Sequence, residues 1–198
     1  MPQLPPVTKA LMLICTALFC VQQLFGFWIE GFFALWPLAS GHFLPWQVIS
    51  YAFLHGDATH LFFNMLGLWM FGSEIELIWG RKRYMHFLVA SALAGAVAQM
   101  AVSLVVPMGP TLGASGALYG LLLAFGMLFP DRIIMPLFPP IPMKAKYFVA
   151  LFGGIELVMG LFGRGGIAHF AHLGGMLGGW LIIRYWRGQS PFPPRRRR

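Results

Sequence analysis

The chain has 198 residues, of which 58% are hydrophobic and only 10% charged, against about 25% charged residues in an ordinary soluble domain. Its mean hydropathy is +0.71, which means more apolar surface than a soluble domain of this length can bury. These figures exclude a disordered chain and a disulfide scaffold, and they indicate a multi-pass membrane protein. The two cysteines, Cys15 and Cys20, share one apolar run and are expected to be free thiols.

Six apolar segments predict an all-α protein with six membrane-spanning helices. Most of them approach the ~20 residues that a span requires. They cover residues 10–28, 61–79, 86–106, 115–129, 147–162 and 168–185. No small-residue cleavage site follows the first segment, so we interpret it as a helix rather than a signal peptide. We expect a single membrane domain over residues 1–190 and a disordered basic tail over residues 191–198.

The formal net charge of +8 predicts the orientation of these helices. If both termini are cytoplasmic, 13 of the 14 Lys and Arg residues face the cytosol and only Arg164 faces outside, as the positive-inside rule requires. The basic residues are scattered over the inner loops. We therefore interpret them as a topology signal and as contacts to lipid headgroups, and not as a nucleic-acid-binding patch. The long first outer loop, residues 29–59, carries Trp36 and Trp46 and is expected near the membrane interface.

The fourth segment is unusually short. Its 15 residues, 115–129, make a helix of about 22 Å, whereas the hydrocarbon core is about 30 Å thick. The stretch before it, residues 107–114, holds two Pro and two Gly and cannot be regular helix. Such backbone is tolerated at depth only when it is buried in protein or lines water. Pro130 and Arg132 fix the far end at the cytoplasmic face, so Ser115 is predicted at a submerged helix N-terminus facing a cavity open to the outside.

Ser115 has two readings at this position. Free N–H groups in the first turn of a helix stabilise a developing oxyanion, which suits a nucleophile; a serine there is also a common N-cap. A serine nucleophile needs a base, and His172 lies about one turn into the sixth segment, at similar depth. GxxxG patterns beginning at Gly116 and Gly175 would let the two backbones approach and bring His172 to Ser115. The same glycines serve ordinary helix packing in either case.

Other polar residues in the spans are candidates for supporting roles. Tyr119 is one turn after the serine and is expected to stack on the imidazole. His60 and Asn64 share one face of the second segment and are candidate oxyanion donors. For Asn64 the alternative is a hydrogen bond between helices. Glu156 lies in the middle of the fifth segment, where we expect a structural hydrogen bond between helices rather than a role in orienting His172.

Residue types exclude other classes of membrane protease. No His is followed by Glu, so there is no HExxH zinc site, and neither Asp lies in a span, so there is no aspartyl pair. All lysines lie at or inside the cytoplasmic face, which argues against a Ser–Lys pair. The pairs His55/His60 and His169/His172 lack a nearby Cys or carboxylate, and we expect no metal and no other cofactor.

Three motifs stand in order along the chain. They are HLFFN at residues 60–64, GASG at 113–116 followed by Tyr119, and AHLGG at 171–175 followed by Gly179. They are similar to the HxxxN, GxSG and AHxxGxxxG motifs of the rhomboid intramembrane serine proteases, and the sequence resembles the minimal six-helix bacterial type over roughly residues 40–185. The segment from Glu76 to Gly80 also resembles the family. Gln47 is a departure, because many members have Arg there.

The resemblance implies a catalytic dyad without an aspartate. Ser115 would be the nucleophile and His172 the general base; His169, one turn earlier, lacks the glycine spacing. The supporting residues would be His60, Asn64 and the Ser115 backbone in the oxyanion hole, with Gly113 beside it and Tyr119 against the His172 ring.

The implied activity is cleavage of transmembrane proteins near the outer end of their helix. The substrates would be single-span proteins that reach the site from the lipid bilayer between the second and fifth helices. The implied location is a bacterial inner membrane. A rhomboid-like binding protein without activity is the alternative, although such relatives lack the serine or the histidine. A transporter would show repeat symmetry, which we do not find.

Overall fold

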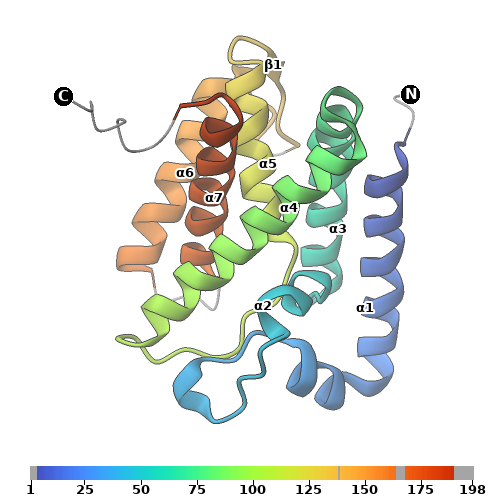
Figure 1. Cartoon of the computed structure of the whole chain (residues 1–198), viewed down its shortest axis with the longest axis vertical. Helices are drawn as coiled ribbons and strands as arrows, with labels where there is room; N and C mark the ends of the chain where they lie inside the picture. The colour runs from blue at the N-terminus through green and yellow to red at the C-terminus, as the bar shows by residue number, and fades with distance from the viewer. Residues whose placement is uncertain (1–3, 138, 164–167, 190–198) are drawn as a thin grey trace, which may run out of the picture.

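The computed structural model describes residues 4–137, 139–163 and 168–189, which form a bundle of helices (Figure 1). The helices are α1 (Pro6–Phe33), α2 (Gln47–Ser50), α3 (Ala58–Gly67), α4 (Ser73–Ser103), α5 (Ser115–Leu128), α6 (Ala145–Phe162) and α7 (His169–Trp186). The shorter elements are the 3-10 turns η1 (Leu38–Ser40) and η2 (Tyr51–Phe53), the π-helical turn η3 (Leu68–Gly72), and the antiparallel strands β1 (Ile133–Ile134) and β2 (Met143–Lys144). The predicted tail, residues 191–198, lies outside the described residues.

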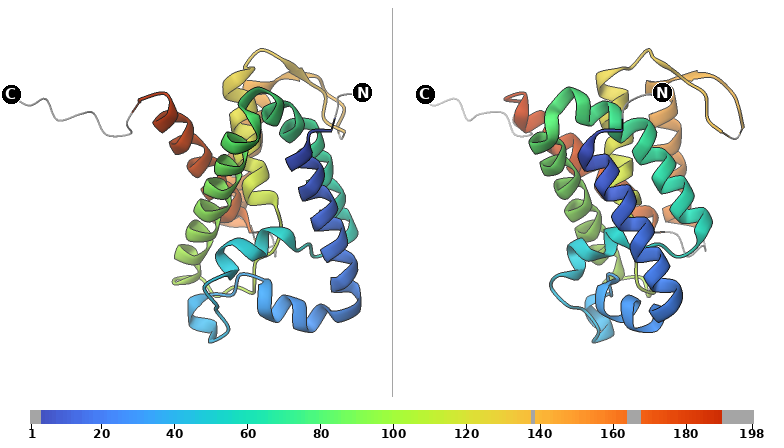
Figure 2. Two further views of the ribbon diagram at one scale, coloured as in Figure 1. Left: turned by 45° about the vertical axis from the view of Figure 1, so that its right-hand side comes forward. Right: turned by 90° about the vertical axis from the view of Figure 1, so that its right-hand side faces the viewer.

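Three helical stretches in the described part of the chain are long and apolar enough to cross a membrane. They are Pro6–Phe33, Ala58–Ser103 and Ala145–Phe162. The second of them combines α3, η3 and α4, and it contains one non-helical residue, Gly80, with a φ of 74°. The chain folds back there, so the predicted second and third segments form the two arms of a hairpin (Figure 2). Helix α5 is apolar but shorter. The predicted helical architecture is thus confirmed apart from the short pair β1 and β2, while the count of six spans stays a prediction.

Helix boundaries differ modestly from the predicted segments. Helix α1 begins four residues before the predicted start at residue 10, since Pro6 provides a favourable first helical residue, and it bends at Phe25 (φ −130°, ψ 30°). Helix α5 begins at Ser115 as predicted. Both cysteines are free, as expected.

Helices α4, α5 and α7 pack against one another at the centre, and α6 covers α5 and α7. The predicted close contact between α5 and α7 is confirmed. A Cβ atom added to Gly175 would lie 1.8 Å from the backbone oxygen of Gly116, so any larger residue would force the helices apart. The two backbones that carry Ser115 and His172 are therefore in direct contact.

Large apolar side chains cover the outside of the bundle. Leu24, Phe27, Val105 and Phe162 are 77%, 84%, 81% and 81% exposed, respectively. Apolar exposure on this scale is unusual for a soluble monomer and is what a lipid environment requires.

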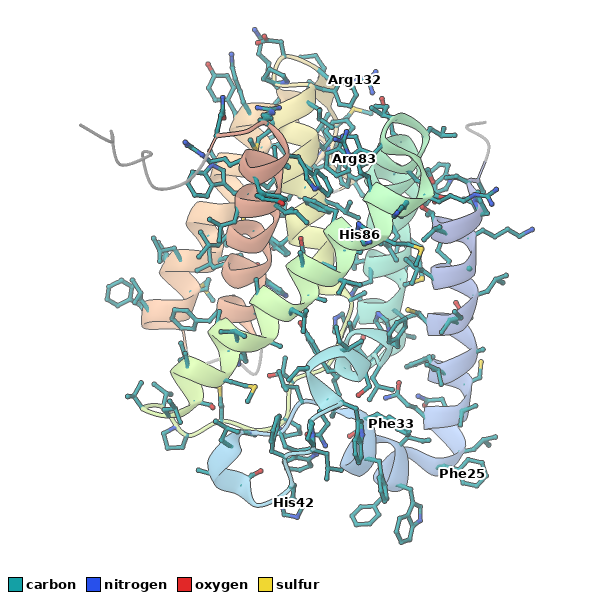
Figure 3. All side chains as sticks on the ribbon, in the orientation of Figure 1. Phe25, Phe33, His42, Arg83, His86 and Arg132 are labelled. Carbon is teal, nitrogen blue, oxygen red and sulfur yellow. The ribbon has the colours of Figure 1, made fainter. Side chains whose placement is uncertain are left out.

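Basic side chains gather at one end of the bundle. Arg83 and Arg132 lie at the end where α1 begins and α7 finishes, whereas His42 lies at the opposite end (Figure 3). This arrangement is the one that the positive-inside prediction needs. The side of the membrane that each end faces stays a prediction.

The carboxylate of Glu76 ties α1 to α4. It accepts hydrogen bonds from the backbone N–H groups of Val7 and Thr8, at 2.9 and 2.7 Å, and from the Thr8 hydroxyl at 2.9 Å. The first N–H groups of a helix have no partner within the helix, and a negative charge near them interacts favourably with the helix dipole. Glu76, which is buried, therefore completes the N-terminus of α1.

Replacing Glu76 with alanine should lower the free energy of unfolding by about 2–4 kcal/mol, because buried donors on α1 lose their charged acceptor. Reversible unfolding in mixed detergent micelles measures this. Glu74→Ala is the matched control: Glu74 pairs with Arg132 at the exposed surface, where an ion pair contributes at most about 1 kcal/mol. Equal destabilisation of the two variants would contradict the role given to Glu76.

Candidate active site

The irregular segment before α5 is held by the first loop. Leu35 and Thr111 exchange backbone hydrogen bonds of 2.8 and 2.9 Å, and the N–H of Gly113 donates to the Tyr51 carbonyl at 2.9 Å. The Tyr51 hydroxyl in turn donates to the Ala92 carbonyl of α4 at 2.8 Å. This segment climbs from the lower end of α4 into the bundle, so α5 starts well above the lower ends of α1 and α4 (Figure 1). The loop thus fixes Ser115 inside the bundle.

Ser115 is the first residue of α5 and does not cap it. The N-cap is Ala114, and no side chain caps this helix. The reading of Ser115 as a simple N-cap is therefore wrong. Its Oγ instead lies 2.7 Å from Nε2 of His172 on α7, within hydrogen-bond distance. Since α5 and α7 touch through their glycines, the pair forms across this close contact between the two helices.

The imidazole of His172 is clamped on its flat face. The ring of Tyr119 stacks on it with the centroids 4.3 Å apart and the planes 6° from parallel, as the one-turn spacing from Ser115 predicts. His172 is buried. His169, the other candidate base, does not reach the serine, because its ring is directed to Glu156, as described below.

Gly113 brings His60 close to the serine. Its φ of 127° is a conformation that side chains rarely adopt. A Cβ atom there would lie 2.7 Å from Nε2 of His60 and 3.5 Å from Oγ of Ser115. His60 is held in turn by Asp57, which accepts its backbone N–H at 2.8 Å and caps α3, and by the His55 ring, 5.2 Å away between centroids.

Asn64 is buried one turn after His60. Its amide Nδ2 donates to the His60 carbonyl at 2.8 Å, and its Oδ1 has no hydrogen-bond partner among the described residues. In the same part of the chain Asn64 makes no hydrogen bond to another helix, so the alternative of a tie between helices is not what the structure contains. One amide hydrogen remains available to a ligand.

Glu156 on α6 contacts both α5 and α7. It bonds to other helices, as expected: its carboxylate accepts the Tyr119 hydroxyl of α5 and lies 2.6 Å from Nδ1 of His169. However, its Oε2 also lies 2.9 Å from Nδ1 of His172. The contact is off the direction of the ring N–H, so it is close without being an aligned hydrogen bond. The expected hydrogen bonds between helices are therefore confirmed, and the close contact with His172 is an addition that the sequence did not predict, because it depends on which face α6 turns towards α7.

Glu156, His169 and His172 form a buried group whose atom types could hold a metal ion. The statement that no carboxylate lies near the histidine pair on α7 is therefore wrong. The separations of 2.6 and 2.9 Å from Oε2 are nevertheless hydrogen-bond distances. Tetrahedral zinc ligands at about 2.0–2.1 Å from the metal would stand about 3.4 Å apart. The group therefore fits a proton-sharing network better than a metal site.

Gln47 is the hub of the first loop. It is fully buried, its Oε1 accepts the backbone N–H groups of Trp36 and Leu44 at 3.3 and 3.1 Å, and its Nε2 donates to the His42 carbonyl at 3.2 Å. The glutamine that departs from the family pattern thus performs a loop-holding role through neutral hydrogen bonds.

Comparisons with known proteins match most of the chain. The sequence model described as "Rhomboid domain" matches residues 42–188. The chain is 35% identical over 147 residues to "Rhomboid protein 1, mitochondrial" of Saccharomyces cerevisiae, a match that covers 70% of this chain and 42% of that protein. It is 29% identical over 185 residues to "Rhomboid protease GlpG" of Yersinia enterocolitica, which covers 93% of this chain and 63% of the relative. The GlpG of Yersinia pestis is 28% identical over the same length.

The chain thus spans less than two thirds of the length of these relatives. Together with the apolar helices, the matches make it an integral membrane protein.

Proposed function

The chain belongs to the rhomboid family, and we propose that it is an intramembrane serine endopeptidase that cuts transmembrane proteins near the outer ends of their helices. The observation that carries this proposal is the pairing of Ser115 Oγ with His172 Nε2 at 2.7 Å. It occurs at a helix N-terminus, where free N–H groups favour a developing negative charge.

The proposed mechanism uses the geometry of this pair. Oγ of Ser115 attacks the scissile carbonyl carbon while Nε2 of His172 takes its proton. The backbone N–H of Ser115 and the side chains of His60 and Asn64 donate to the oxyanion. The imidazolium then protonates the leaving amine, which leaves an acyl-enzyme. Water deprotonated by His172 hydrolyses the acyl-enzyme and restores the serine.

An inactive rhomboid-like binding protein is the less favoured function. That role needs neither the serine nor the histidine, yet both are present and lie within hydrogen-bond distance of each other. Gly113 also keeps, directly beside His60 and Ser115, a backbone conformation that residues with a side chain rarely adopt.

The proposal is tested with the purified chain in proteoliposomes and a single-span reporter protein as substrate. Mass spectrometry of the products should locate one main cut near the outer end of the reporter helix. The matched control is a reporter that differs only by leucines at the cut, which stiffen its helix. It should be cut more slowly, since the scissile bond must leave its helix to reach Ser115. A cut in the inner half of the helix would contradict the proposal.

We further propose that the chain lies in a bacterial inner membrane with both termini in the cytosol. A reporter enzyme that is active only outside the cytosol should be silent when fused after Arg198. The same reporter should be active when inserted at Gly41, which is exposed in the turn after η1. The opposite pattern of activities would place the site on the cytoplasmic face and contradict an outward-facing cavity.

A further inference from the structure

Glu156 stands at the centre of the polar network behind the proposed base. It is one of two acidic residues in the described chain that are buried; the other, Glu76, caps α1 far from the site. Its Oε1 accepts the Tyr119 hydroxyl, and its Oε2 lies 2.6 Å from Nδ1 of His169 and 2.9 Å from Nδ1 of His172. A buried carboxylate is costly unless several donors surround it. Glu156 therefore has three partners, two of which, Tyr119 and His172, belong to the proposed active site.

The tautomer of His172 follows from its contacts. If Nε2 accepts the hydroxyl proton of Ser115, the neutral ring carries its hydrogen on Nδ1. Nδ1 is buried and has no aligned hydrogen-bond partner among the described residues. The Oε2 atom of Glu156 lies 2.9 Å away and is an acceptor within reach of this N–H. A carboxylate in this place favours the productive tautomer and the imidazolium that forms during attack.

We propose that Glu156 is a positioning residue that completes a Ser115–His172–Glu156 relay. This inference rests on the proposed serine protease function and adds a third member to the dyad that the sequence motifs imply. The carboxylate acts on the reaction only through the imidazole of His172, whose tautomer it fixes. It also holds the Tyr119 hydroxyl, and the Tyr119 ring in turn fixes the plane of the imidazole. The proton itself moves between Oγ and Nε2, and Glu156 stays ionised.

The test compares Glu156→Gln with the unmodified chain. Glutamine keeps the shape but can offer an N–H to Nδ1, which favours the tautomer with its hydrogen on Nε2 and leaves Ser115 without a base. We expect kcat to fall about 10–100-fold, since Tyr119 still holds the ring. KM should change less than about twofold, because Glu156 does not touch the substrate. Glu156→Asp keeps the charge and should recover part of the loss.

His169→Asn is the matched control, because it removes the other histidine that bonds to the same oxygen. If the role of Glu156 is purely structural, Glu156→Gln and His169→Asn should both lower the melting temperature, and the folded fractions of the two variants should have similar kcat values. The relay predicts a much larger fall in kcat for Glu156→Gln. A second readout is the rate at which a fluorophosphonate phosphonylates Ser115 with loss of fluoride, which should fall in parallel.

The possible results distinguish failure of the role proposed for Glu156 from failure of the proposed protease function. If Ser115→Ala is inactive and Glu156→Gln cleaves within twofold of the unmodified rate, the relay is wrong and the proposed function stands. If the unmodified chain neither cleaves the reporter nor reacts with the fluorophosphonate, both are overturned. A slow Glu156→Gln variant of normal melting temperature, partly rescued in Glu156→Asp, supports the relay.

Discussion

Replacing Ser115 with alanine should lower kcat for cleavage of a transmembrane reporter by at least about 10⁴-fold, because no other hydroxyl of the described residues forms a hydrogen bond with His172. His172→Ala should have an equal effect, since the serine then lacks the acceptor 2.7 Å from its Oγ. The two residues act as one unit, so the double variant should be no slower than either single variant. Initial rates in proteoliposomes measure all three.

Two control variants separate this loss from damage to the fold. Ser103→Ala removes a hydroxyl that bonds only to the Met100 carbonyl of its own helix, and His42→Ala removes an exposed loop histidine. Both should cleave at the unmodified rate. Ser115→Ala should keep the melting temperature to within a few degrees, because it loses one hydrogen bond. His172→Ala should melt lower, because it also loses the Tyr119 stack and the contact with Glu156. Full activity of Ser115→Ala would remove the serine from the mechanism.

The fold could be predicted where a pattern has one physical meaning. The start of α5 at Ser115 could be predicted from the stretch before it, residues 107–114. Its two prolines and two glycines do not permit a helix to begin earlier. The glycine repeats predict the contact of α5 with α7. Only a residue without a Cβ atom fits at Gly175, because an added Cβ would lie 1.8 Å from the backbone oxygen of Gly116. The π-turn η3 inside the predicted second segment was missed, because an apolar run does not reveal how the backbone is wound locally.

A contact in the site could be predicted where the sequence shows the position of both residues, and it was missed where the position of one of them depends on tertiary packing. Ser115 and Tyr119 share a helix face, so the stacking on His172 follows from spacing. Glu156 gave a clear signal as an acidic residue in the middle of a span. What the sequence lacks is the rotation of α6, which decides whether Glu156 faces α7. The hydrogen bonds of Gln47 depend likewise on how the loop closes around it.

The structure allows a clear test of the role of Asn64. A tie between helices would require a partner on another helix, yet the amide donates to the His60 carbonyl of its own helix, and no other hydrogen bond forms among the described residues. Losing such a bond costs about 1 kcal/mol. A polar side chain kept in a buried place for so little stability is better explained by a bond that forms during the reaction.

Replacing Asn64 with alanine should therefore act on kcat. Loss of one oxyanion donor typically lowers kcat by about 10²–10³-fold, or about 2.7–4 kcal/mol, and the lower figure applies here because His60 and the Ser115 N–H remain. KM should change little, since the interaction strengthens only in the transition state. Gln22→Ala is the contrasting control: this buried amide binds both the N–H and the carbonyl of His55, so its loss should mainly lower the melting temperature. If Asn64→Ala instead melts many degrees lower with normal kcat, Asn64 serves the fold and the oxyanion depends on His60 and the backbone alone.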